Sequence, residues 1–140
     1  MWNPGRDEVR RFFIDTWAKY RRGEPLAGLE QTALGVVLLH PEYHALLAEG
    51  DAALAREYTP DSGELNPFLH LSLHLAIEEQ LSIDQPRGIR AQFERLVSST
   101  GSEHDAKHAV LECLGETIWE AQRSGRPPDE QAYLECLARK

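Results

Sequence analysis

Histidines are the residues of this chain whose spacing most clearly indicates chemistry. All six fall into pairs four residues apart: His40 with His44, His70 with His74, and His104 with His108. Six histidines placed at random over 140 positions would pair completely in this way with a chance on the order of 10⁻⁴. Residues four apart on an α-helix lie about 5–6 Å from each other on one face, so two imidazoles can turn toward one cation. The spacing therefore predicts a metal site built on helices.

The second and third pairs lie on the apolar faces of their predicted helices. Counting about 100° per residue places each pair in line with apolar residues of its own helix. These apolar residues are Ile77 and Leu81 for the second pair, and Leu111 and Ile118 for the third pair. Both pairs of imidazoles are therefore expected to point into the core.

A carboxylate follows each of these two pairs at the same offset. Glu78 and Glu112 each stand four residues after the second histidine of a pair, so the pattern His-x-x-x-His-x-x-(Ile/Leu)-Glu occurs twice. The first pair is followed by Leu47 but has Ala48 at the position of the acid. The chain thus contains two full copies of a ligand pattern and one partial copy.

This set of side chains offers more ligands than one tetrahedral ion needs. We therefore predict a dinuclear centre, and its nitrogen-rich shell favours iron, with zinc or manganese as alternatives to it, over calcium or magnesium. A mononuclear site with three histidines and a metal-free helical adaptor remain open. The predicted ligands are His40, His44, His70, His74, Glu78, His104, His108 and Glu112.

Helices must position these residues, and residues that typically begin or end helices recur along the whole chain. Asn3-Pro4 and Asn66-Pro67 each combine a cap with a first-turn proline. Ser102 resembles the first residue of a capping box. Pro41 must break or restart a helix, so His40 is expected to lie at the junction between two helices. The predicted helices cover residues 4–23, 25–40, 41–50, 68–81, 86–97, 103–122 and 127–137, with a loop at 59–63.

The length and composition predict one soluble domain. The 140 residues, 41% of them hydrophobic and 27% charged, contain no apolar run of about 18 residues that could cross a membrane. No stretch alternates in the manner of a strand. We therefore expect a single all-α domain over residues 1–140, a bundle of about six or seven helices with the histidine site in its core.

The net charge limits the expected binding partners, and the first residues indicate the expected cellular compartment. A net charge of −8 argues against nucleic acid or an anionic membrane as partner, because both are bound largely by clustered Lys and Arg. The first residues include no apolar signal segment, so the cytoplasm is the expected location. Cys113 and Cys136 are too few for a disulfide scaffold and are expected to be thiols there.

Several segments of the chain carry motifs that occur together: residues 3–4, 10–13, 40–44, 66–74, 84–86 with 88–90, and 112–116. In this combination the chain resembles the proteobacterial family called domain of unknown function 1841. The resemblance spans nearly the whole chain, and its most specific motif is NPFLHLSLH at 66–74. It implies no activity and no catalytic residues, since the function of that family is not known.

Two functions of different classes fit these observations. The first is a di-metal, iron-like centre that handles a small molecule such as oxygen or a peroxide. The second is a zinc-stabilised structural or sensory domain that acts through a protein partner. The chain contains no glycine-rich phosphate loop or nucleotide motif that would indicate a reaction. Whether the protein is an enzyme is therefore left open.

Overall fold

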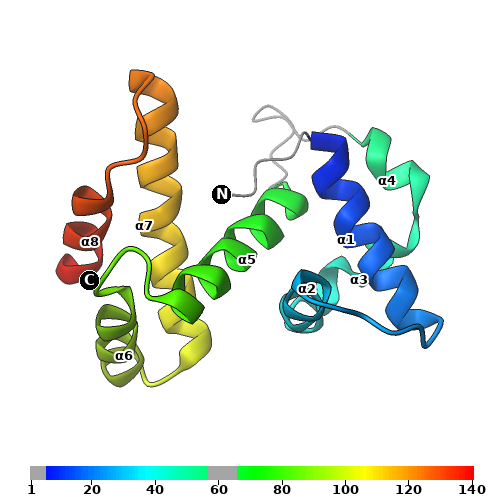
Figure 1. The fold of residues 1–140 in the computed structure, drawn as a ribbon, viewed down its shortest axis with the longest axis horizontal. Coiled ribbons are helices and arrows are strands. Elements are labelled where there is room, and N and C mark those ends of the chain that lie inside the picture. Colours follow the sequence, from blue (N-terminus) through cyan, green and yellow to red (C-terminus); the bar gives the residue numbers. More distant parts are fainter. Residues whose placement is uncertain (1–5, 57–65) are drawn as a thin grey trace. The chain divides into compact units, whose positions relative to one another are not determined.

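The computed structural model describes residues 6–56 and 66–140, and every regular element in these two ranges is a helix (Figure 1). None of these helices is long and apolar enough to cross a membrane. The all-α prediction is thus confirmed, while the predicted cap at residues 3–4 and the loop at 59–63 lie outside the described residues. The elements are α1 (Arg6–Arg21), α2 (Leu29–Leu38), the 3₁₀ turn η1 (Pro41–Tyr43), α3 (His44–Ala48), α4 (Asp51–Ala55), α5 (Pro67–Ile83), α6 (Ile89–Thr100), α7 (Glu103–Ser124) and α8 (Glu130–Arg139).

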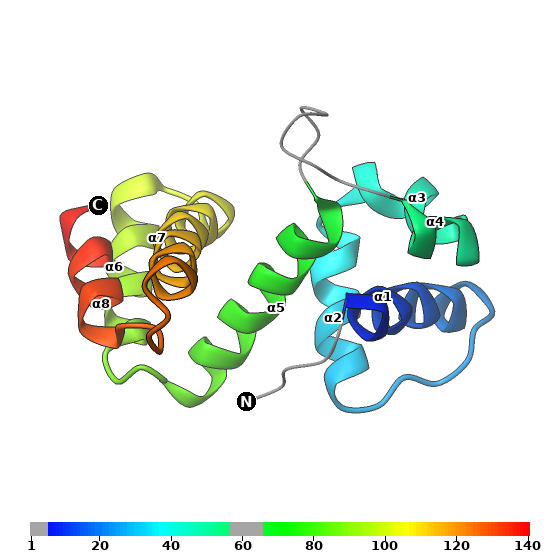
Figure 2. The ribbon, with the colours of Figure 1, turned by 90° about the horizontal axis from the view of Figure 1, so that it is seen from above.

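The chain divides into two compact units, Met1–Leu75 and Ala76–Lys140. The first contains α1 to α4 and the start of α5, and the second contains the end of α5 with α6, α7 and α8. Figure 2 shows the three helices α6, α7 and α8 side by side.

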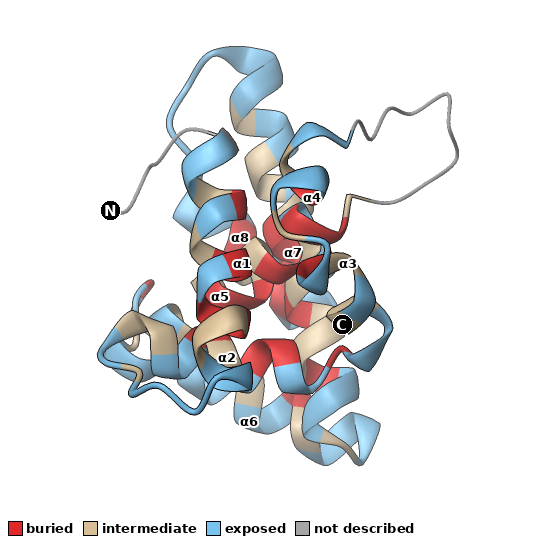
Figure 3. Cartoon of the chain, turned by 90° about the vertical axis from the view of Figure 1, so that its right-hand side faces the viewer, coloured by how far each residue is buried: buried red, intermediate tan, exposed pale blue. Residues whose placement is uncertain are grey.

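The core of the first unit is formed by the apolar faces of four helices and of the first turns of α5. Figure 3 marks in red the buried stretches of α1, α2 and α5. On α1, Phe13 and Trp17 recur at helical spacing, as the apolar periodicity predicts. The buried cluster comprises Phe13, Ile14, Trp17, Ala33, Val36, Val37, Leu47, Ala53, Phe68, Leu71 and Leu75.

The helix α5, which carries two of the histidines, begins where the sequence predicts. The Asn66 side chain accepts hydrogen bonds from the backbone N–H groups of Phe68 at 3.0 Å and Leu69 at 3.2 Å. These are two of the four N–H groups that a helix start leaves without an internal partner. Pro67 needs no such bond, and its fixed φ suits the first helical position. The predicted cap is therefore confirmed, and it sets the register of His70 and His74.

A buried arginine ties α1 to the end of α4. Arg10 is only 3% exposed, and its Nη1 donates to the carbonyl oxygens of Ala53 at 3.2 Å, Leu54 at 3.1 Å and Arg56 at 2.6 Å. Its guanidinium also lies 5.0 Å from the centre of the Phe68 ring. The last carbonyls of a helix lack the full set of partners inside it, and this side chain donates to three carbonyls at and just after the end of α4, one of which, that of Ala53, also accepts from the backbone N–H of Arg56.

Replacing this arginine by methionine tests that role. We expect Arg10→Met to lower the free energy of unfolding by about 2 kcal/mol, since the new side chain cannot donate to the three carbonyls. Urea denaturation followed by circular dichroism measures the change. The matched control is Arg11→Met, whose exposed ion pair with Asp51 contributes less than about 1 kcal/mol. Equal losses in the two variants would contradict the assignment.

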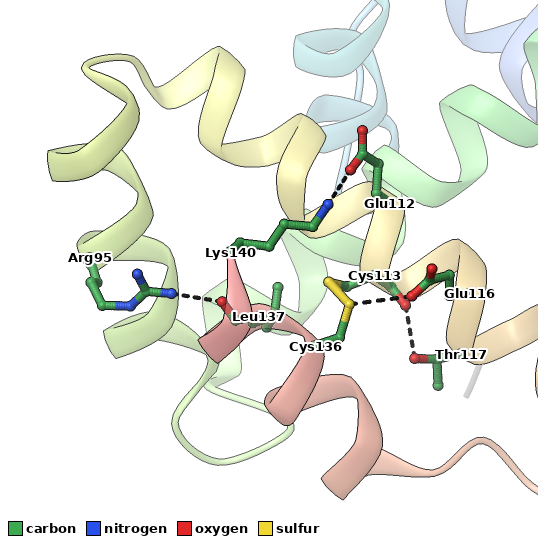
Figure 4. The surroundings of a disulfide bond; sticks show 8 residues. All are labelled: Arg95, Glu112, Cys113, Glu116, Thr117, Cys136, Leu137 and Lys140. Carbon is green, nitrogen blue, oxygen red and sulfur yellow. Dashed lines mark hydrogen bonds and ion pairs between the residues drawn. A yellow bond between two sulfur atoms is a disulfide. The ribbon is translucent and has the colours of Figure 1, made fainter.

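The core of the second unit lies between α6, α7 and α8, and a disulfide crosses it (Figure 4). Cys113 on α7 and Cys136 on α8 are bonded through their sulfurs, with their Cα atoms 5.8 Å apart. The expectation of two thiols is therefore wrong. The two residues are 23 positions apart, and only the packing of α8 against α7 brings them within the Cα distance that a disulfide requires.

Candidate metal centre

Three of the predicted histidines lie together in the first unit. The ring centres are 5.0 Å apart for His40 and His70, 4.6 Å for His40 and His74, and 4.8 Å for His70 and His74. One ring nitrogen from each residue can serve as a ligand atom, and these atoms all lie within 4.8 Å of one another. Donors this close together can converge on a single ion.

Local sequence explains how the three rings come from two elements. His40 follows the last turn of α2, and Pro41 opens the 3₁₀ turn directly after it, so the chain changes direction at this histidine as predicted. His70 and His74 are one turn apart on α5, where residues at i and i+4 share a face.

The side chain of His40 is arranged as metal-ligating histidines usually are. Its Nδ1 lies 2.8 Å from the carbonyl oxygen of Val36, and because a carbonyl only accepts, Nδ1 carries the proton. In the neutral imidazole the other nitrogen, Nε2, then presents a lone pair. The residue is only 2% exposed, and among the described residues Nε2 is the single buried side-chain nitrogen or oxygen without a hydrogen-bond partner. A backbone carbonyl on one nitrogen commonly orients such a ring for a metal at the other.

The two histidines of α5 meet through their Nε2 atoms. The Nε2 of His74 lies 3.2 Å from the Nε2 of His70. A tetrahedral ion with metal–nitrogen distances of about 2.0–2.1 Å holds its ligand nitrogens roughly 3.3–3.4 Å apart. His74 is 3% exposed and His70 is partly exposed. The two nitrogens are thus spaced as the ligands of one ion would be.

A tyrosine forms one wall of this cluster. The ring of Tyr43 is nearly parallel to that of His40, with 5.6 Å between centres, and lies edge-on to His70 at 6.0 Å. Burial, helped by the charge of Glu42, raises the pKa of the Tyr43 phenol, which therefore stays protonated at neutral pH. Its place agrees with the packing role that aromatic residues at a site rim usually have.

The fourth histidine of the first unit is engaged elsewhere. The Nε2 of His44 donates to the carbonyl oxygen of Val37 at 2.9 Å, and its ring stacks on Trp17 with 4.2 Å between centres. The structure therefore does not bring His44 into the cluster of His40, His70 and His74.

The remaining predicted ligands belong to the second unit. His104 and His108 face each other on α7, with ring centres 4.3 Å apart. Their part in a metal site stays a prediction.

The two predicted carboxylate ligands have cationic partners in the same unit. Glu78 pairs with Lys107 at 2.6 Å, and Glu112 pairs with Lys140, as Figure 4 shows. The hydrogen bond from Lys140 lowers the pKa of the Glu112 carboxyl. Both acids are thus in ion pairs, and sequence reasoning had named neither lysine as a partner.

The Val36 carbonyl is a further part of the site that the sequence analysis did not name. Its position four residues before His40 is a signal that could have found it, because a side chain at the end of a helix often bonds the carbonyl one turn back.

Comparisons with known proteins agree with the resemblance noted in the sequence. Over 116 residues the chain is 30% identical to a protein of Alcanivorax borkumensis named ribosomal RNA large subunit methyltransferase G. That match covers 80% of this chain but only 27% of the relative, so the chain spans about a quarter of the relative's length. No solved structure matches the chain significantly. The family model described as "Domain of unknown function (DUF1841)" matches residues 5–139, and the chain therefore belongs to that family.

Proposed function

We propose that this protein binds a transition-metal ion through His40, His70 and His74. The observation that carries the proposal is the Nε2 atom of His40, which is buried and without a hydrogen-bond partner beside two further imidazoles. Leaving a buried polar atom without a hydrogen-bond partner costs about 1–3 kcal/mol, so the burial of such an atom requires an explanation. A bound cation supplies that explanation, because it would accept the lone pair.

One ion is favoured over two. A dinuclear centre of the kind that the sequence pattern predicts would use Glu78 and Glu112 as bridging carboxylates, and both are paired with lysines. Three imidazoles, by contrast, are the protein ligands of known mononuclear sites, in which water or a substrate takes the fourth position. The dinuclear arrangement, with His104 and His108 as further ligands, would bind twice as much metal.

The type of ligand limits which metal the site would bind and which chemistry that metal would support. Imidazole nitrogens suit iron, zinc, copper or nickel better than they suit calcium or magnesium, and we propose iron first, with zinc and manganese as alternatives. Three protein ligands leave at least one coordination position for water or a small molecule. An iron ion with such a position would bind oxygen or a peroxide, and in this form the site is a small-molecule centre.

The second candidate function is a zinc-stabilised accessory domain that acts through a protein partner. The match to about a quarter of a much longer relative favours it, because a sequence of this kind then forms part of a larger protein. The methyl transfer named for that relative is a property of that protein. A net charge of −8 disfavours direct contact of this chain with RNA, so a protein partner is the better fit.

Elemental analysis of the untagged protein tests the proposal. We expect about one equivalent of a single transition metal per chain, after both aerobic and anaerobic purification. Less than about 0.1 equivalent, even after incubation with iron(II), zinc and manganese salts, would overturn it. Two equivalents would instead support the dinuclear prediction, and the double variant His104→Gln/His108→Gln would then lose one of them.

Chelation separates the two candidate functions. If the metal is structural, its removal unfolds the first unit and the helical circular dichroism signal falls. If the site is an open small-molecule centre, the metal-free protein stays folded and takes the metal up again.

A further inference from the structure

A second candidate site lies in the first unit, in a groove between α1 and α3. The groove has a volume of about 510 Å³, which is within the usual range of small-molecule sites. The three clustered histidines do not line it, so the groove is separate from the candidate metal centre. Its walls come from Ile14, Trp17 and Ala18 on α1 and from Ala45, Leu47 and Ala48 on α3.

The floor of the groove is apolar, and small side chains keep it open. Trp17 and Leu47 are almost fully buried, and His44 stacks on the indole ring, which fixes the base of the groove. Ala45 and Ala48 are exposed at its side. An apolar ligand could therefore cover these residues and remove their surface from water, which is favourable at about 25 cal/mol per Å².

The rim at the end of α1 is cationic, in contrast to the chain as a whole. Arg21 and Arg22 both line the groove, and no acidic side chain does so in the described part of the protein. Arg22 is already paired with Glu24. The guanidinium of Arg21 lies 5.9 Å from the centre of the Trp17 ring, at the edge of the apolar floor. The rim of the groove is thus positively charged beside an apolar surface, although the whole chain has a net charge of −8.

We propose that this groove binds a small carboxylate with an apolar body. The guanidinium of Arg21 holds the carboxylate, for which its planar donors are well suited. The apolar body of the ligand lies along the alanines of α1 and α3 over Trp17. This proposal does not depend on metal binding at His40, His70 and His74.

Three simple probes separate the parts of this proposal. Octanoate has both the charge and the apolar body, 1-octanol has only the body, and acetate has only the charge. Isothermal titration calorimetry is expected to show saturable binding of octanoate at one site per chain, at least tenfold tighter than the binding of 1-octanol or acetate, which is about 1.4 kcal/mol. In an NMR spectrum, the indole N–H signal of Trp17 should shift while that of Trp119 in the second unit does not.

Variants locate the binding. The double variant Arg21→Gln/Arg22→Gln should weaken octanoate binding by about tenfold or more and leave the weak binding of 1-octanol unchanged. Ala48→Phe, at an exposed position, should fill the groove and abolish binding. The matched control is Arg123→Gln, because Arg123 also lies over a tryptophan ring, at 5.2 Å from Trp119, and pairs with a nearby acid, Glu120.

Three results would overturn the proposal. They are no binding of octanoate at about 10 mM, equal binding of octanoate and 1-octanol, and an equal loss of binding in the Arg123→Gln control. Helical circular dichroism of each variant shows that it is folded. If Ala48→Phe does not fold, the charge-removing double variant still decides the question.

Discussion

We expect the replacement of His40 by alanine to lower the affinity of the protein for the proposed metal ion by about 100-fold or more. Mutation of the residues that merely orient a metal ligand typically costs 10–100-fold in affinity, so loss of a ligand should cost at least as much. His40 supplies the buried Nε2 lone pair, and the alanine side chain supplies nothing in its place. Competition with a chromophoric chelator measures the dissociation constants of the two proteins.

The matched control is His44→Ala, four residues along the chain. The Nε2 of His44 donates to the Val37 carbonyl and its ring packs on Trp17, so this variant should lose stability while its metal affinity stays within about threefold of wild type. An equal loss of metal affinity in both variants would contradict the three-histidine site and restore His44 as a ligand. Unchanged affinity in both His40→Ala and His74→Ala would show that the metal binds outside this cluster.

Thermal unfolding provides a second readout of the same prediction. A ligand that binds only the native state stabilises it by about 2.7 kcal/mol at a free concentration of 100 times its dissociation constant. Added metal should therefore raise the melting temperature of the wild-type protein. At the same metal concentration it should leave that of His40→Ala nearly unchanged, and an equal rise in both proteins would count against the site.

The helices were predictable because local signals set them. Asn66 and Ser102 cap the helices that the sequence assigns to them, and each does so through a side chain that reaches only two or three residues along the chain. Pro41 ends the preceding helix by lacking an N–H group, which again is a local effect. Apolar periodicity then indicates the face that each helix buries.

The candidate site was predictable only where its residues share one unbroken helix. His70 and His74 do so on α5, and their rings meet as the i, i+4 rule requires. His40 and His44 have the same spacing, but Pro41 and the 3₁₀ turn separate them, so the rule fails and their rings turn to different partners. Equal spacing in a sequence implies a shared face only if the helix is continuous.

The sequence could not predict the ion-pair partners of the two candidate carboxylate ligands, because these partners come from other parts of the chain. Glu112 follows its histidines at the spacing of a ligand, yet its side chain pairs with Lys140, 28 residues further along the chain. Glu78 pairs with Lys107 from another helix in the same way. The partner of a charged residue depends on packing between helices, and that packing has no short-range signal. The same reason applies to the disulfide.

We expect removal of the disulfide to destabilise the second unit by about 3 kcal/mol. Cys113 and Cys136 are 23 residues apart, and the cross-link restricts the unfolded chain by an amount that depends on the length of this loop. The double variant Cys113→Ala/Cys136→Ala should therefore show a lower free energy of unfolding in urea. Wild-type protein in excess dithiothreitol should lose a similar amount, because reduction removes the same constraint.

Alkylation and metal binding decide whether this loss comes from the cross-link. Unfolded, unreduced wild-type protein should take up no iodoacetamide by mass spectrometry, and reduced protein should take up two equivalents, one on each cysteine. The double variant should keep the metal affinity of wild type, since His40, His70 and His74 belong to the first unit. Two reactive thiols in the unreduced protein, together with unchanged stability of the double variant, would show that these cysteines are unpaired and that packing alone holds α8 against α7.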